Sequence, residues 1–368
     1  MESCEVLIVG GGPAGSTCAA KLVAAGLDVL LLDKANFPRT KPCAGWITPA
    51  VFDALAIDPA EYGQGRVLQA ISGFRTGLIS GPEVVTCYDQ VVSYGILRRE
   101  FDDYLLKRSH VRRRLGEGVN RLDRQDGGWL VNGRIKARLL IGAGGHFCPV
   151  ARRLGARLGQ EAVVVAQVAE EILTPEEASR CPVPGDTPAL FFCPDLQGYG
   201  WLLRKGNVLN VGLGRHDRQD FRRHLQDFRA FLVARGDLPA DFAGHFQGHA
   251  YGLYDRHFGR RCVGEGALLI GDAAGLAAVH SGEGILPAVE SALLAAATIV
   301  AAQGDYAYAT LEAYATCLAR RRKNVPSFSL PAVFVQRLGA FLLATPWATR
   351  HLILNRCFLH SQQSTRTF

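Results

Sequence analysis

The chain has 368 residues, 48% of them hydrophobic, with a formal net charge of +7 and ten cysteines. Such a length allows a large core in one to three domains, and the order of elements predicts two interleaved domains. No basic run is interleaved with aromatic residues on one face, which excludes nucleic acid as a partner. Cysteines without C-x-x-C or metal-ligand spacing favour reduced thiols in a cytoplasmic protein and no metal site.

The first predicted element is an apolar strand over residues 6–9, which leads directly into a glycine-rich turn. Gly10, Gly12 and Gly15 fit G-x-G-x-x-G, and a helix is predicted over residues 16–26. Glycines in this pattern allow a tight turn, close backbone approach to a pyrophosphate, and packing of the helix on the strand. The N–H groups and the dipole at the helix N-terminus attract the phosphate charge, so we predict a dinucleotide site here.

A second apolar strand over residues 29–32 ends at Asp33, and Lys34 follows. Asp33 lies roughly 20 residues beyond the glycines, where a carboxylate that binds ribose hydroxyls is expected. Lys34 is predicted to lie near the adenosine. The order of strand, glycines, helix, strand and acid favours a dinucleotide-binding fold over a glycine turn in an ordinary α/β domain.

The middle of the chain indicates a second domain. Residues 71–94 alternate weakly between apolar and polar types, and further strands are predicted over residues 163–168, 190–193 and 208–213. A helix is predicted over residues 219–234. We interpret this part as an antiparallel sheet that contributes the substrate site.

A strand over residues 267–270 ends at Gly271 and Asp272. This order places a carboxylate at a strand's carboxyl end, where ligands bind in open α/β sheets, although an aspartate there can also cap the next helix. Residues 282–285 open a long helix, whose N–H groups and dipole would stabilise a reduced flavin. One large dinucleotide held by both ends of the chain points to FAD.

The predicted fold class is α/β: a Rossmann-like FAD-binding domain of the glutathione reductase type, interleaved with a smaller antiparallel-sheet substrate domain, plus C-terminal helices. The predicted FAD-binding domain comprises residues 1–70, 96–159 and 260–302. The predicted substrate domain comprises residues 71–95 and 160–259, and the C-terminal helical segment comprises residues 303–368.

The motif order resembles the flavoprotein superfamily of p-hydroxybenzoate hydroxylase and geranylgeranyl reductase. G-x-G-x-x-G is followed by R-x-x-F-D from Arg98 and by G-D-A-A-G from Gly271. The resemblance implies that Arg98 contacts FAD and that Asp272 contacts a ribityl oxygen, whereas a solvated helix face is the alternative for Arg98. The full predicted cofactor-binding set is Gly10, Gly12, Pro13, Ala14, Gly15, Asp33, Lys34, Cys43, Ala44, Arg98, Gly271, Asp272, Gly282, Gly284 and Ile285.

Two segments resemble the geranylgeranyl reductase branch. Residues 41–45 are similar to its K-x-C-G-G loop, with Ala44 at the first glycine position, which implies that Cys43 lies near the flavin. Residues 199–205 are similar to its Y-x-W-x-F-P-K motif, which implies that Tyr199 and Trp201 line the substrate pocket. On a strand these two aromatic side chains share one face, as pocket lining or as ordinary core.

Two residues are candidates for proton transfer. Cys43 is predicted to donate a proton beside the flavin, with packing as the alternative because a free cysteine is often a small buried hydrophobe. Glu283 is predicted to give or take a proton, with a favourable interaction with the helix dipole as the alternative.

We expect an FAD-dependent oxidoreductase that reduces or dehydrogenates C–C bonds of a lipophilic substrate by hydride transfer through flavin N5. The alternative is a flavin monooxygenase that hydroxylates an aromatic small molecule or a tryptophan of a partner protein. NAD(P)H is the candidate electron donor, and ferredoxin or a quinol is the alternative because Gly144 stands where related hydroxylases have aspartate.

The segment over residues 330–343 is apolar and includes Arg337. It predicts a helix packed on the substrate domain or, alternatively, an interfacial helix that contacts lipid to collect an apolar substrate. We expect a cytoplasmic protein without signal peptide or membrane-spanning helix, peripheral to the inner membrane face in the second case.

Overall fold

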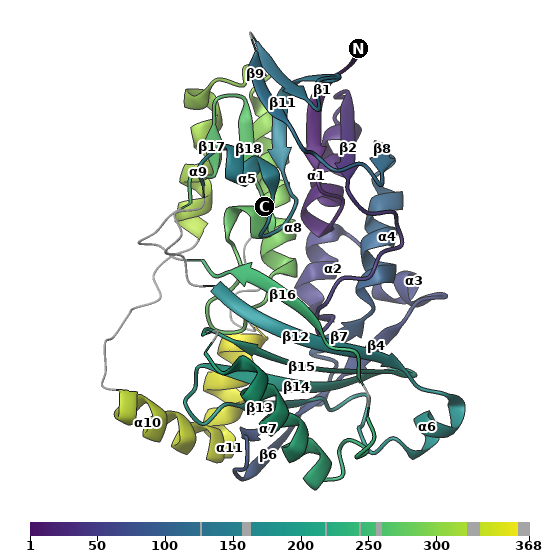
Figure 1. Cartoon of the computed structure of the whole chain (residues 1–368), viewed down its shortest axis with the longest axis vertical. Helices are drawn as coiled ribbons and strands as arrows, with labels where there is room; N and C mark the ends of the chain where they lie inside the picture. The colour runs from purple at the N-terminus through teal and green to yellow at the C-terminus, as the bar shows by residue number, and fades with distance from the viewer. Residues whose placement is uncertain are drawn as a thin grey trace. The chain divides into compact units, whose positions relative to one another are not determined.

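In the computed structural model, residues 1–125, 127–156, 163–217, 219–242, 244–254, 260–321 and 332–359 are described. They form two compact units, and each unit is assembled from three separate stretches of chain (Figure 1). The first unit comprises Met1–Thr40, Arg99–Ala162 and Tyr251–Pro326. The second unit comprises Lys41–Arg98, Val163–Ala250 and Ser327–Phe368. The bounds of the FAD-binding and substrate domains given above stay predictions.

The first unit contains a sheet with the strand order β17-β18-β11-β1-β2-β8. Its central strands run parallel, and they are apolar and buried, as expected for a sheet covered on both faces. Strands β9 and β10 extend β11 as an antiparallel meander. The strands are β1 (Glu2–Val9), β2 (Val29–Asp33), β8 (Arg112–Leu115), β9 (Leu122–Gln125), β10 (Gly128–Val131), β11 (Ile135–Gly142), β17 (Val263–Gly264) and β18 (Ala267–Leu269).

Two helices of the first unit contact each other although they lie far apart in the sequence. Helix α1 (Pro13–Ala24) follows β1, and α8 (Ile285–Ala301) begins soon after β18. The buried faces of both helices consist mostly of small residues, which permits close packing. The other helical segments of this unit are α5 (Pro149–Arg153), the 3₁₀ turn Gly271–Ala274 and α9 (Tyr308–Arg321), and α4 (Arg98–Arg108) begins at the boundary between the units.

The second unit contains a sheet with the strand order β16-β12-β15-β14-β13-β5-β6. Its assigned pairs are antiparallel except for β13 with β5, which run parallel. Strands β3, β7 and β4 form a small antiparallel sheet. The strands are β3 (Trp46–Ile47), β4 (Leu68–Ile71), β5 (Gly73–Leu78), β6 (Glu83–Cys87), β7 (Ser93–Ile96), β12 (Val163–Ile172), β13 (Ala189–Phe192), β14 (Gly198–Lys205), β15 (Val208–Arg215) and β16 (Gln247–Gly252).

Each face of the second unit's large sheet has its own apolar cluster. Helix α7 (Phe221–Ala234) covers one face with an apolar stripe that includes Phe228, whose ring fills the space that a side chain at Gly200 would need. The π-helix Thr349–Phe358 contributes Phe358 to the cluster on the other face, which contains Trp201. The remaining helices are α2 (Pro49–Leu55), α3 (Pro59–Gly63), α6 (Pro175–Arg180), α10 (Ala332–Ala344) and α11 (Pro346–Ala348).

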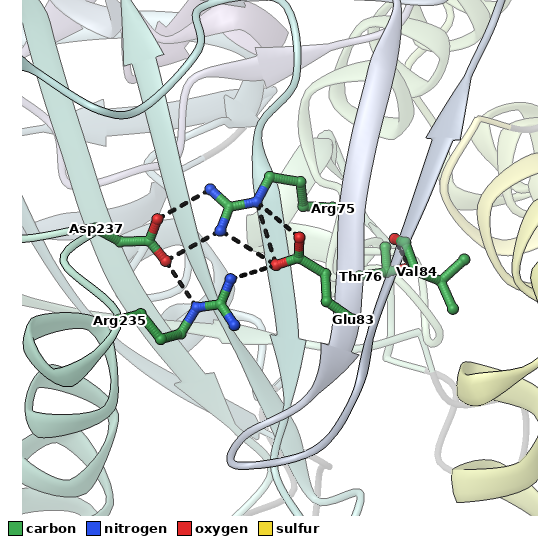
Figure 2. A network of polar contacts seen from close by, with 6 residues as sticks. All are labelled: Arg75, Thr76, Glu83, Val84, Arg235 and Asp237. Carbon is green, nitrogen blue, oxygen red and sulfur yellow. Dashed lines mark hydrogen bonds and ion pairs between the residues drawn. The ribbon is translucent and has the colours of Figure 1, made fainter.

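Four charged side chains join the β5–β6 hairpin to the end of α7 (Figure 2). Arg75 forms two hydrogen bonds with Asp237, of 3.0 and 3.1 Å, and also pairs with Glu83 at 3.1 Å. Arg235 completes the ring by contacting Glu83 at 2.6 Å and Asp237 at 2.8 Å. Two cations and two anions balance, so this ring stabilises the second unit without a net charge.

The predicted fold class is confirmed: a Rossmann-like parallel sheet and a separate, largely antiparallel sheet are both present. The predicted helix over residues 16–26 begins earlier, at Pro13, because proline is well suited to the first turn of a helix. Of the apolar C-terminal segment over residues 330–343, residues 330 and 331 lie outside the described residues.

Candidate functional site

The turn between β1 and α1 can be built only with glycine at two positions. Gly10 has a φ of +114°, and a Cβ atom there would collide with the carbonyl oxygen of Ala143. A Cβ atom at Gly15 would collide with the carbonyl oxygen of Gly10, so this glycine lets the helix pack on the strand end. Gly12 is the N-cap residue of α1 and has no side chain that could accept hydrogen bonds from the first N–H groups of the helix. This is the arrangement that an anion bound at a helix N-terminus requires.

Asp33 lies at the end of β2 beside this turn. Its carboxylate accepts hydrogen bonds from the backbone N–H groups of Gly11, at 2.7 Å, and Ala35, at 2.9 Å. Each carboxylate oxygen has a further lone pair, so these bonds leave acceptor capacity for the predicted ribose contact. Lys34, the other residue predicted here, is exposed.

Arg39 is a cation beside the glycine turn that the sequence interpretation missed. Its Nη2 atom lies 3.4 Å from the position that a Cβ atom of Gly12 would occupy. The guanidinium is held by Asp102, a fully buried carboxylate 3.1 Å away, and lies over the Phe37 ring. Asp102 is the last residue of the R-x-x-F-D motif. The motif therefore identified this acid, but it did not predict that the acid pairs with Arg39.

The second glycine segment lies against the first. A Cβ atom at Gly271 would lie 3.0 Å from the Cβ atom of Ala14 in α1 and 3.3 Å from that of Ala288 in α8. The Asp272 carboxylate lies 3.1 Å from the position of a Cβ atom at Gly284, the N-cap of α8. The first unit therefore brings together the starts of α1 and α8 and the carboxylate of Asp272.

Residues 278–284 form the turn that precedes α8. Gly282 has a φ of +67° and donates to the carbonyl oxygen of Ala278 at 2.9 Å. The N–H of Glu283 donates to the Ser281 hydroxyl at 3.3 Å, and its carbonyl oxygen accepts from Ala278 at 2.8 Å. Ile285, the last of the predicted residues in this segment, is the first residue of the helix and is buried. The predicted proton-transfer role of Glu283 stays a prediction.

The second unit contains the remaining predicted residues. Cys43 is half-buried, and its carbonyl oxygen accepts from Asn210 at 2.9 Å. Ala44 packs against the apolar cluster that contains Trp201. Arg98 is buried at the start of α4, which is contrary to the solvated-face alternative, while its contact with FAD stays a prediction.

Tyr199 and Trp201 lie near each other on β14, with ring centroids 6.1 Å apart. Both belong to an aromatic cluster, in which Phe358 lies 5.5 Å from Tyr199 and stacks on Trp46 at 5.6 Å. Phe74 and Phe192 complete the contacts around these rings. The cluster is a largely buried apolar and aromatic core, and Ala44, the residue after Cys43, packs against it.

Other cysteines have a different environment from Cys43. Burial raises the pKa of the Cys18 thiol to about 12. Burial also raises the pKa of Cys148, with hydrogen bonds from neighbouring backbone N–H groups opposing the shift. Cys18 and Cys148 are buried, protonated packing groups, whereas Cys43 is half-buried.

Comparison with known proteins agrees with this arrangement. Residues 8–41 match a family described as an NAD(P)-binding Rossmann-like domain. Menaquinone reductase of Mycobacterium tuberculosis is 31% identical over 320 residues, which cover 80% of this chain and 76% of that protein. The chain belongs to the geranylgeranyl reductase-like family of FAD-dependent oxidoreductases. The superfamily resemblance predicted from the motifs is thereby confirmed.

One further relative and one solved structure are also similar to this chain. Geranylgeranyl diphosphate reductase of Synechocystis is 28% identical, and the match covers 82% of this chain and 76% of that protein. A geranylgeranyl bacteriochlorophyll reductase-like protein from Thermoplasma acidophilum has a crystal structure with a TM-score of 0.70 and 20% identity. That similarity covers 94% of this chain and 88% of the other, and at this identity it establishes the fold alone.

The residues of the first unit fit the FAD that this family uses. Glycines without Cβ atoms and an N-cap without a side chain suit a pyrophosphate, and the guanidinium of Arg39, paired with Asp102, lies beside the same turn. Asp33 is the predicted ligand of the ribose, and Asp272 that of the ribityl chain. These individual assignments remain predictions, whereas dependence on FAD is a property of the family.

Proposed function

We propose that this member of the geranylgeranyl reductase-like family reduces carbon–carbon double bonds in the isoprenoid part of a lipophilic substrate. The single observation that carries the proposal lies within the second unit: a half-buried thiol, Cys43, is placed in a loop that packs on an aromatic and apolar cluster. Relatives named menaquinone reductase and geranylgeranyl diphosphate reductase act on such molecules and support this substrate class.

The reaction requires two electrons and two protons for each double bond. FAD, when bound, supplies the hydride equivalent after reduction by an external donor, for which NAD(P)H is our candidate. In our proposal the thiol of Cys43 donates the second hydrogen as a proton and regains a proton from water. Tyr199 and Trp201 hold the substrate chain by apolar contact and exclude water from the reacting carbons.

The test is anaerobic turnover of the FAD-loaded, dithionite-reduced protein with geranylgeranyl diphosphate and with a menaquinone as probes. We expect flavin reoxidation and a product that has gained hydrogen, and replacement of Cys43 by alanine should reduce the rate about a hundredfold while FAD stays bound. No hydrogen gain with either probe overturns the proposed substrate class, and undiminished turnover by C43A overturns the role of the thiol.

The same reduced protein distinguishes the monooxygenase alternative. Rapid mixing with oxygen in the presence of an aromatic probe yields a product that has gained oxygen if the alternative is correct. We expect slow reoxidation and no oxygenated product. An oxygenated product formed at a rate that accounts for flavin reoxidation would replace our proposal with the alternative.

We also propose that the protein takes its substrate from an anionic lipid surface through α10. Phe334, Leu338 and Phe341 follow each other at helical spacing and are 54%, 41% and 65% exposed. The opposite face of the helix contains the buried Leu343. Trp347, in the following turn, is also exposed.

Charge supports lipid as the occupant of this face. Residues 332–359 contain three arginines and no acidic residue, and Arg337 is exposed on the same side of α10 as the aromatic residues. An exposed apolar stripe with aromatic residues and arginine is typical of helices that lie in a membrane interface. In the described part of the chain, no helix is long and apolar enough to span a membrane.

Sedimentation with lipid vesicles tests this surface. We expect binding to phosphatidylglycerol vesicles, weaker binding to phosphatidylcholine vesicles, and a loss of about tenfold or more in F334S/F341S. Ile172→Ser is the matched control, because Ile172 is similarly exposed on β12. Equal binding by F334S/F341S and I172S would overturn the assignment of α10 as the lipid-binding face.

A further inference from the structure

Two segments that the sequence interpretation treated separately are one structural feature of the second unit. Lys205 is the last residue of the aromatic motif on β14, and its side chain is fully buried. Its ammonium donates to the carbonyl oxygen of Ala44 at 3.1 Å and to that of Ile96 at 3.0 Å. The third bond is to Glu170 at 2.7 Å, so all three N–H donors have acceptors.

Asn210 holds the neighbouring residue of the same loop. Its amide nitrogen donates to the carbonyl oxygen of Cys43 at 2.9 Å and to the same Glu170 oxygen at 2.9 Å. Its amide oxygen accepts from the indole N–H of Trp201 at 2.7 Å. Asn210 is fully buried, so each of these bonds replaces water that the group cannot reach.

The register of three strands brings these side chains together. Asn210 on β15 pairs with Glu170 on β12 and with Leu203 on β14. Trp201, Leu203 and Lys205 alternate along β14, so their side chains point to the same face. The sheet thus presents an acid, an amide and an ammonium in one place without any contribution from the loop's own sequence.

Glycines make room for the long side chain of Lys205. A Cβ atom at Gly45 would lie 2.9 Å from the Lys205 nitrogen, and one at Gly95 would lie 2.8 Å from its Cγ atom. Both approaches are too close for any residue with a side chain. The geometry of the loop therefore depends on Gly45 in its backbone and on Gly95 in β7 as well as on the Lys205 side chain.

We propose that Lys205, Glu170 and Asn210 form a clamp that fixes the backbone of the Cys43 loop, so that the sheet sets the position of the thiol. These are positioning residues, which act through the carbonyl groups of Cys43 and Ala44. The inference deepens the proposed function, because the clamp matters for turnover only if Cys43 takes part in it.

The clamp also connects the aromatic cluster to the loop. The chain of hydrogen bonds runs from the Trp201 indole to Asn210 and from Asn210 to the Cys43 carbonyl group. A substrate that displaces Trp201 therefore acts on the same side chain that holds the loop. Burial lowers the pKa of Lys205 and the charge of Arg98 lowers it further, while Glu170 and Cys43 oppose the shift.

Hydrogen exchange of the FAD-loaded protein tests the clamp without substrate. We expect Lys205→Met to accelerate amide exchange in residues 41–48 by about tenfold or more. The variant loses the hydrogen bonds from the Lys205 ammonium to the carbonyl oxygens of Ala44 and Ile96. Arg204→Met is the matched control, since Arg204 is the adjacent cation on the opposite face and, among the described residues, its side chain bonds to its own turn at Gly206. Equal exchange in K205M and R204M would overturn the clamp.

Glu170 allows a test by conservative replacement. E170Q keeps an acceptor oxygen for Lys205 and Asn210, whereas E170A removes it, so E170A should loosen the loop and E170Q should retain most of its protection. Because the Glu170 side chain is 30% exposed, both variants should fold even if K205M does not. Equal loop exchange in E170A and the unaltered protein would also overturn the clamp.

Kinetics separates the clamp from the proposed function. A positioning role predicts that E170A lowers kcat about tenfold with KM changed less than about twofold, and that E170Q restores most of kcat. A change confined to KM would overturn the positioning role. Absence of turnover in the unaltered protein would overturn the proposed substrate class, while the exchange result would still decide the clamp.

Discussion

The two units hold their candidate sites by different means. In the first unit the site is made of backbone: glycines at the starts of two helices, with Asp33, Arg39 and Asp272 around them. In the second unit the loop that contains Cys43 is held by side chains from three strands. A site formed by closely packed backbone tolerates almost no added atoms, whereas a loop held by several side chains tolerates the loss of one of them. Substitutions in the two units should therefore differ in the size of their effects.

The largest effect is expected from Gly15→Ala. The added Cβ atom would overlap the Gly10 carbonyl oxygen, so α1 must move away from β1. We expect a loss of more than about 3 kcal/mol in the free energy of unfolding and protein without FAD, measured by thermal unfolding and by flavin absorbance. Gly248→Ala is the control, because no atom of the described residues lies within 4 Å of a Cβ atom there. Normal FAD content in G15A would contradict the backbone description.

The ring of charges in Figure 2 gives the next largest effect. Asp237→Asn leaves two arginines facing one acid. We expect the free energy of unfolding, measured with urea at neutral pH, to fall by about 3 kcal/mol. Exposed Asp227 in α7 is the control, and D227N should change stability by less than about 1 kcal/mol. Equal losses in the two variants would show that the ring contributes nothing specific.

The ring also predicts a pH dependence. Burial alone would raise the pKa of Asp237, but hydrogen bonds and charges from Arg75 and Arg235 outweigh it, so the pKa lies below its usual value. A carboxyl group whose pKa is lower in the folded than in the unfolded state stabilises the folded protein at pH values above the unfolded pKa of about 3.9. This stabilisation is lost as the pH falls through the pKa of the folded state. Unfolding free energy should therefore fall more steeply below about pH 4 in the unaltered protein than in D237N.

A smaller effect is expected from Asp272→Ala, which sharpens the description of the first unit. Loss of a hydrogen bond from a ribityl hydroxyl to a carboxylate should weaken FAD binding about tenfold to a hundredfold, with little change in stability. Titration of the apoprotein with FAD measures this affinity. Exposed Asp28 provides the control D28A, and the same affinity in D272A and D28A would remove Asp272 from the cofactor site.

The smallest effect is expected from Trp201→Phe in the second unit. The ring remains in the aromatic cluster, but the bond to Asn210 is lost, at a cost of about 1 kcal/mol in stability. We also expect faster amide exchange in residues 41–48, because Asn210 loses one of its anchors. Unchanged exchange there would show that Asn210 holds the loop independently of Trp201.

The same contrast explains what could be predicted from the sequence. The glycine turn, Asp33 and the parallel strands were predictable because G-x-G-x-x-G and apolar runs describe local backbone requirements. Alternation along a strand also predicted that Tyr199 and Trp201 share a face. The contacts of Lys205 with Glu170 were not predictable, because they depend on the register of β12, β15 and β14, and the pairing of Arg39 with Asp102 depends on two segments that meet only in the fold.

The stacking of Phe358 on Trp46 has a consequence for the order in which the protein is made. Trp46 leaves the ribosome well before its aromatic partner Phe358, which follows 312 residues later in the sequence. The sheet face around Trp201 therefore lacks the cover of Phe358 until that residue has been synthesised. Fluorescence of a variant that retains only Trp46 would report when this face closes, and release of Phe358 sets the earliest moment.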